Sequence, residues 1–127
     1  YFWKNAYKNP LAQVFIWDGG FNKKQVSLKY IQTYMKKISE LPEEMFFHLL
    51  KIMHDHDIIV DLEKIQIPTL IIGGDKDKII PNYLQLMLHK YLKNSELYIV
   101  KDGSHVPQAD FPETINERID RFIARLN

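Results

Sequence analysis

The sequence predicts an α/β fold in which two parallel strands are flanked by helices and preceded by a helical region. Two short apolar runs, residues 69–72 and 97–100, enclose a segment with helical periodicity. Strand-like runs that alternate with helical patterns are typical of βαβ units, in which the strands are parallel. We therefore expect a helical region over residues 1–60 and a βαβα core over residues 61–127.

The composition favours one globular domain and excludes several classes of partner. Of the 127 residues, 46% are hydrophobic and 13% are aromatic, which is enough apolar material for a core. The net charge of +1, from 17 Lys and Arg and 16 Asp and Glu, gives no electrostatic reason to bind nucleic acid or an acidic membrane. No apolar run approaches the roughly 20 residues that span a bilayer. The absence of cysteine excludes disulfides and fits a cytoplasmic location.

The first 25 residues predict short helices and turns. Pro10 and the pair Gly19-Gly20 interrupt this segment. Its aromatic side chains are most simply core residues, and the alternative is that they line an acyl-binding pocket. These aromatic residues are Tyr1, Phe2, Trp3, Tyr7, Phe15, Trp17 and Phe21.

Two amphipathic helices are predicted next. After Val26, and again after Pro42, apolar side chains recur at the i, i+3, i+4, i+7 spacing of one helix face. Pro42 suits a first helical turn, and Glu43 and Glu44 lie near the positive end of the helix dipole. The apolar faces consist of Ile31, Tyr34, Met35 and Ile38 in the first helix, and Phe46, Leu49, Leu50 and Met53 in the second, which ends near His54.

The second half predicts two strands joined by a helix, the first of them buried. The first apolar run is rich in β-branched residues and is closed by the pair Gly73-Gly74, as expected of a strand in a parallel sheet. Pro81 opens the connecting helix, and Asp110 is predicted to cap the last helix. The expected apolar faces are Leu84, Met87, Leu88 and Tyr91 in the connecting helix, and Ile115, Ile119, Phe122, Ile123 and Leu126 in the last.

Polar loops follow both predicted strands. In parallel sheets, catalytic groups gather at the carboxyl ends of strands, and neighbouring strands lie about 4.8 Å apart. Asp75 and Asp77 follow the first strand and His105 follows the second, so a carboxylate and an imidazole can meet there. A carboxylate that orients a histidine, which takes the proton of a nucleophile, is the pair that a catalytic triad requires.

These loops resemble the corresponding loops of the α/β-hydrolase family. In residues 62–81, Gly74, Asp77 and Pro81 match the pattern Gly-x-x-Asp-x-x-x-Pro that follows strand seven of the family. Residues 103–105, Gly-Ser-His, are similar to the segment after strand eight that supplies the catalytic histidine. The order of acid and histidine along the chain also fits the family.

The resemblance implies that the chain is the C-terminal part of an α/β-hydrolase fold, with residues 1–60 as a helical cap. It implies a serine hydrolase, an esterase or lipase that acts on a small-molecule ester. In such an enzyme His105 is the general base and then the general acid, and Asp77 orients His105. Both residues are therefore predicted to be catalytic.

Other interpretations of these residues stay open. Asp75 is the rival acid, because two aspartates in one loop leave the choice to geometry. Asp77 could instead cap a turn, and Asp102 is most simply a turn residue. A metal site at His54 and His56 would need an extended segment, because helical residues two apart point about 200° apart. We predict no metal and no cofactor.

The family nucleophile, a serine in Gly-x-Ser-x-Gly, is absent from the sequence. We therefore interpret the chain as a fragment of a longer hydrolase that is inactive alone. Its open strand edge predicts self-association, most simply as a two-fold dimer. Two alternatives remain: a non-catalytic α/β module that binds a partner through this edge, and a family member with epoxide hydrolase, haloalkane hydrolase or haloperoxidase-like chemistry.

Overall fold

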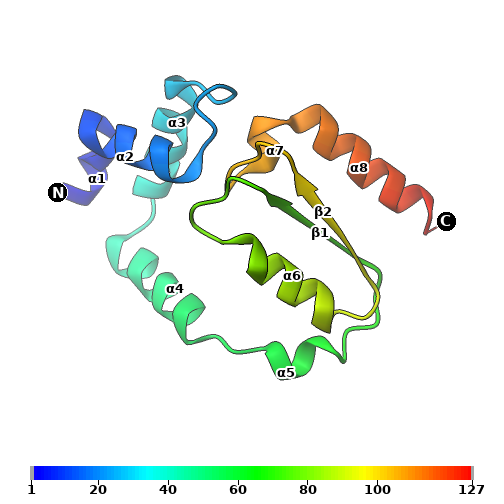
Figure 1. The fold of residues 1–127 in the computed structure, drawn as a ribbon. Coiled ribbons are helices and arrows are strands. Elements are labelled where there is room, and N and C mark those ends of the chain that lie inside the picture. Colours follow the sequence, from blue (N-terminus) through cyan, green and yellow to red (C-terminus); the bar gives the residue numbers. More distant parts are fainter. Residues whose placement is uncertain (1, 127) are drawn as a thin grey trace.

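Helices make up the first half of the chain in the computed structural model, which describes residues 2–126 (Figure 1). The helices predicted after Val26 and after Pro42 are both present. The Ser27 side chain caps the first of them by accepting a hydrogen bond from the amide of Tyr30. The elements are α1 (Phe2–Asn5), the 3-10 helix η1 (Ala6–Lys8), α2 (Pro10–Gly20), α3 (Leu28–Ser39), α4 (Glu43–Asp55) and α5 (Ile59–Leu62).

The second half contains the predicted βαβ unit. Strands β1 (Thr69–Gly74) and β2 (Ser95–Val100) are parallel neighbours. Helix α6 (Asn82–Tyr91) joins them and packs against one face of the sheet, while α8 (Pro112–Ala124) lies on the other side (Figure 1). The short helix α7 (Pro107–Asp110) connects β2 to α8. Both strands therefore end at the same edge of the sheet, as predicted.

Gly73 and Gly74 belong to β1, although the sequence analysis placed them after the strand. A Cβ atom at Gly73 would lie 3.1 Å from Cγ of Gln85 in α6, so a larger residue there would force the Gln85 side chain to shift. A Cβ atom at Gly74 would lie 2.2 Å from the carbonyl oxygen of Gly103, which is closer than atoms can pack. The two glycines therefore continue the strand where other chain segments approach its backbone most closely.

The core consists of two clusters. One cluster is built on Leu62, Ile71 and Leu92, between the sheet and α6. The other is built on Phe21, Val26 and Ile31 in the helical half, and Val106 and Ala109 pack against it from the second half. The segment that carries His105 is thus packed against the helical region. Leu62 of α5 belongs to the sheet cluster. We propose that the helical region ends at residue 60 and that the βαβα core begins at residue 61.

Two predictions about the end of the chain are wrong. The residue before α8 is Phe111, with no side-chain cap, because the Asp110 carboxylate binds backbone amides elsewhere. Of the predicted buried stripe on α8, Ile115 is buried and Phe122 is half-buried, whereas Ile119, Ile123 and Leu126 are exposed. Periodicity identifies an apolar helix face but not what covers it. Within residues 2–126, every helix falls short of the length and apolar character that a membrane crossing requires.

Candidate active site

The loop after β1 holds the Asp77 carboxylate through backbone amides. Oδ1 of Asp77 accepts hydrogen bonds from the amides of Ile79 and Ile80, both at 2.8 Å. The loop itself is fixed to the neighbouring strand, since the amide of Lys76 donates to the carbonyl of Gly103 at 2.9 Å. The side chain of Asp77 is only 4% exposed. Two amide donors satisfy one oxygen of this buried carboxylate and fix its direction.

The loop after β2 turns sharply before it reaches His105. Asp102 has a φ of 59°, in the left-handed region that residues in tight turns adopt. Among the described residues other than glycine, it alone has a positive φ. The amide of Gly103 then donates to the carbonyl of Val100 at 3.1 Å. The tight turn brings Gly103 against Gly74, so the two loops meet directly after their strands.

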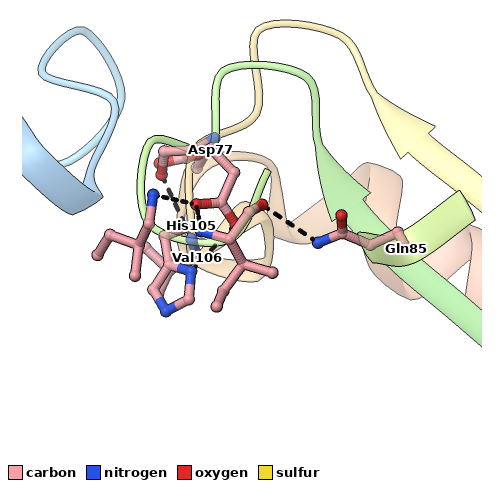
Figure 2. Close-up of polar contacts among 8 residues, drawn as sticks. Asp77, Gln85, His105 and Val106 are labelled. Carbon is pink, nitrogen blue, oxygen red and sulfur yellow. Dashed lines mark hydrogen bonds and ion pairs between the residues drawn. The ribbon is translucent and has the colours of Figure 1, made fainter. Parts of the chain in front are cut away.

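His105 and Asp77 are in contact, as predicted. Nδ1 of His105 lies 3.0 Å from Oδ2 of Asp77 (Figure 2). An ionised carboxylate only accepts hydrogen bonds, so Nδ1 carries the proton and Nε2 is left as an acceptor. The His105 side chain is 35% exposed, so it remains accessible beside its buried partner. Asp75, the rival acid, is exposed. The catalytic role of Asp77 and His105 stays a prediction.

This arrangement can perform the acid–base half of an acyl transfer. A histidine held in one tautomer by a carboxylate can accept a proton at Nε2 from a nearby hydroxyl. The same carboxylate then stabilises the imidazolium that forms. The free nitrogen of this pair is directed away from Asp77 (Figure 2).

The acid loop is also tied to the end of α2. The ammonium of Lys78 donates to the backbone carbonyl of Asp18 at 3.0 Å. Lys23 lies 2.8 Å from the Asp18 carboxylate and, through its hydrogen bond and its charge, holds the pKa of that carboxyl below the ordinary value of 3.8. A cavity of about 490 Å³ separates α2 from the two loops at this point, and Lys24 and Lys76 also line it.

An apolar cavity of about 310 Å³ lies within the helical region. Ile16 and Met35 line it and also pack against the core cluster of Phe21, Val26 and Ile31, against which Val106, the residue after His105, packs as well. Aromatic residues predicted as core or as pocket lining are found here. The side chains that form most of its wall are Trp3, Tyr7, Phe15, Tyr34, Ile38 and Phe46.

None of the four serines among the described residues is bonded to His105. Ser104 precedes it, but its hydroxyl accepts the amide of Val106 at 3.4 Å. Ser95 contacts a different histidine, His89, with 2.8 Å between Oγ and Nδ1. The Ser95 hydroxyl donates to the carbonyl of Leu92 at 2.7 Å, so this pair closes the turn between α6 and β2. Sequence reasoning missed this contact, because histidine and serine six residues apart carry no distinctive signal.

The histidines of the predicted helical half do not converge. His48, His54 and His56 are all exposed, on α4 or just after it. Across residues 2–126, no three His, Asp or Glu side chains are grouped as metal ligands would be.

Comparison with known proteins identifies a family for nearly the whole chain. Residues 2–112 match the family model described as the alpha/beta hydrolase fold. The human serine hydrolase BPHL is 31% identical over 62 residues, which are 49% of this chain and 21% of that protein. The AB hydrolase superfamily protein YisY of Bacillus subtilis is 30% identical over 102 residues, which are 80% of this chain and 38% of that protein.

A solved structure shows the same arrangement of elements. The crystal structure of bromoperoxidase from Bacillus anthracis superposes with a TM-score of 0.75 and 27% identity. The match covers 96% of this chain and 47% of that protein, so the chain spans less than half the length of the proteins it matches.

Proposed function

Because the chain belongs to the α/β-hydrolase family and forms the C-terminal part of that fold, we propose that the full-length protein carrying it is a serine hydrolase that cleaves carboxylic esters. The observation that carries this proposal is the 3.0 Å contact between His105 and the buried carboxylate of Asp77. This contact fixes the orientation of the His105 ring and leaves Nε2 available as a base. The similarity to a protein named as a serine hydrolase supports a serine as the nucleophile.

The proposed mechanism assigns one task to each residue. A serine outside this sequence attacks the carbonyl carbon of the ester, and Nε2 of His105 takes the proton from its hydroxyl. The imidazolium returns this proton to the leaving alkoxide, which departs as an alcohol and leaves an acyl-enzyme. His105 then takes a proton from the water that attacks the acyl-enzyme and gives it to the serine oxygen as the carboxylic acid is released. Asp77 remains ionised and holds His105 in place throughout.

The 127 residues alone are proposed to be inactive. They contain no serine in the Gly-x-Ser-x-Gly setting. The donors that would stabilise the oxyanion also belong to the N-terminal part of the complete fold, and loss of one such donor alone costs about 10²–10³-fold in kcat in known enzymes.

The apolar cavity in the helical region supports an uncharged acyl group as part of the substrate. Its wall is built from aromatic and aliphatic side chains, and it shares Ile16 and Met35 with the cluster behind Val106. Burial of acyl CH₂ groups there would contribute about 0.8 kcal/mol each. A small-molecule ester is therefore the substrate class that we propose. We also propose that the protein acts in the cytoplasm.

The test is ester turnover by the full-length protein and its His105→Ala variant, with p-nitrophenyl butyrate as substrate. We expect His105→Ala to lower kcat by about 10³-fold or more, with unchanged thermal unfolding. His89→Ala is the matched control, because His89 bonds to Ser95 and, among the described residues, has no ion pair with a carboxylate, and it should keep wild-type turnover. Equal turnover by wild type and His105→Ala would contradict the proposal.

A second candidate chemistry follows from the solved relative. The bromoperoxidase of Bacillus anthracis shares the fold at 27% identity, so halide-dependent oxidation by peroxide is to be assayed beside ester turnover. A protein that halogenates in this assay but leaves the ester intact would favour the second candidate.

A further inference from the structure

Asp110 carries a buried carboxylate that the proposed mechanism does not use. The residue is 4% exposed and ends the short helix α7. Its Oδ2 accepts a hydrogen bond from the amide of Ser104 at 2.6 Å, and its Oδ1 accepts one from the amide of Asn22 at 3.3 Å. A buried carboxylate is stable only when such donors replace its water. These two amide hydrogen bonds therefore stabilise the buried carboxylate of Asp110. In return, the carboxylate fixes the positions of both amides.

The two amides belong to segments that meet beside His105. Ser104 directly precedes His105, and the Ser104 hydroxyl accepts the amide of Val106, which directly follows it. The backbone is thus restrained on both sides of the histidine, by Asp110 on one side and by Ser104 on the other. The contact between Asp110 and Ser104 has the shorter distance of the two and an ionised acceptor, so it is the stronger restraint.

Asn22 links the same point to the helical region. Its amide binds Asp110, and its side-chain Nδ2 donates to the carbonyl of Asp102 at 2.8 Å, at the turn of positive φ. Phe21, the residue before it, belongs to the buried cluster against which Val106 packs. One carboxylate therefore connects the loop of His105, the helix after it and the segment after α2.

We propose that Asp110 is a positioning residue that fixes the backbone of His105 at the distance from Asp77 at which this carboxylate can orient the imidazole. The inference rests on the proposed function of His105. Among the described residues, Asp110 makes no hydrogen bond to the imidazole or to Asp77, and it reaches the His105 loop through the amide of Ser104. Displacement of a catalytic group by about 1 Å costs up to about 10²-fold in rate, so loss of this restraint should be visible in kcat.

The test compares Asp110→Asn and Asp110→Ala in the full-length protein with p-nitrophenyl butyrate. Asparagine keeps the size and one acceptor oxygen, but its amide group faces one of the two N–H donors. We expect kcat to fall about tenfold in Asp110→Asn and about a hundredfold in Asp110→Ala, with KM changed by less than about twofold. Asp120→Asn, on the exposed side of α8, is the matched control and should keep wild-type kcat.

A second readout does not depend on turnover. The proton on Nδ1 of His105 that bonds to Asp77 gives a low-field NMR resonance, assigned by its loss in His105→Gln. We expect this resonance to broaden or disappear in Asp110→Asn while it persists in Asp120→Asn. If Asp110→Ala does not fold, Asp110→Asn decides the question.

Wild-type kcat and an unchanged resonance in Asp110→Asn would overturn the inference, even if the variant unfolds at a lower temperature. Such a result would leave Asp110 as a purely structural residue. If His105→Ala keeps wild-type turnover, the proposed function fails instead, and the resonance alone then decides whether Asp110 positions His105.

Discussion

Helix α4 and the two loops after β1 and β2 differ most clearly in how far the chain covers its own side chains. In the loops, the Asp77 side chain is 4% exposed and is held by three hydrogen bonds from its own and the neighbouring loop. In α4, Phe47, Leu49 and Met53 are 55%, 51% and 67% exposed. At the end of the sheet, the described residues themselves supply the hydrogen bonds that fix Asp77. Helix α4, in contrast, presents an apolar surface that the described residues leave largely uncovered.

The difference teaches that the acid–histidine pair is built on the βαβ unit and is held by further contacts from α7 and from the segment after α2. Its geometry depends on the register of two strands, on the approach of Gly74 to Gly103 and on amides within each loop. In α4, Phe46 and Phe47 contact Trp3, but most of the apolar side chains are left uncovered by the described residues. Variants can therefore disturb either region while the other stays intact.

The largest expected effect comes from Gly74→Ala. The added Cβ atom would lie 2.2 Å from the carbonyl oxygen of Gly103, and backbone atoms cannot move aside as a flexible side chain can. We expect the free energy of unfolding of the chain in urea to fall by about 3 kcal/mol or more. Gly19→Ala is the matched control, because nothing lies within 4 Å of its Cβ position in α2, and it should be neutral or slightly stabilising. Equal stability of the two variants would contradict the close contact between the loops.

The sequence predicted the contact of Asp77 with His105 because strand endings and loop motifs are local features. The loop residues, the parallel direction and the order of the elements could all be derived from residues 62–107. Asp110 was predicted as a helix cap, since an aspartate before Pro112 has the local pattern of one. Of its two actual partners, Ser104 is six residues away but Asn22 lies 88 residues away, and no periodicity predicts such a distant contact.

The predicted helices illustrate the same limit. The apolar spacing on α3, α4 and α8 was read correctly, but it is equally regular on a buried and on an uncovered face. Ile31 on α3 is 0% exposed, whereas Ile123 on α8 is 50% exposed. Burial depends on the surfaces that surround a helix, which its own sequence does not contain.

A medium effect is expected from polar substitutions on α4. We propose that the 127-residue chain self-associates through its uncovered apolar side chains and the open edge of β1, as the sequence predicted. Joint replacement of Phe47, Leu49 and Met53 by glutamine should raise the dissociation constant of the self-associated chain about tenfold or more, measured by light scattering across a dilution series. The exposed residues Lys29 and Lys36 of α3, replaced by glutamine, provide the control. A chain that is monomeric at all concentrations would contradict the proposal.

The smallest effect concerns the exposed pair of Asp18 and Lys23. The lowered pKa of Asp18 means that this carboxyl binds its proton less tightly in the folded chain than in the unfolded chain. The resulting stability is present above the ordinary pKa of 3.8 and is lost as the pH falls through the lower folded value. Lys23→Gln should return the pKa of Asp18 towards 3.8, and NMR titration of the carboxyl carbon measures the change. An unchanged titration would show that Lys23 does not cause the shift.

The central claim is that Asp77, and not Asp75, orients His105 for catalysis. The direct measurement is kcat of the full-length protein for p-nitrophenyl butyrate in Asp77→Asn and Asp75→Asn. Asparagine at residue 77 keeps the shape but no longer selects the productive tautomer, so kcat should fall by about 10³–10⁴-fold. Asp75 is exposed and Asp75→Asn should keep kcat within about twofold of the wild type. A large loss in Asp75→Asn together with near-normal turnover in Asp77→Asn would contradict the account.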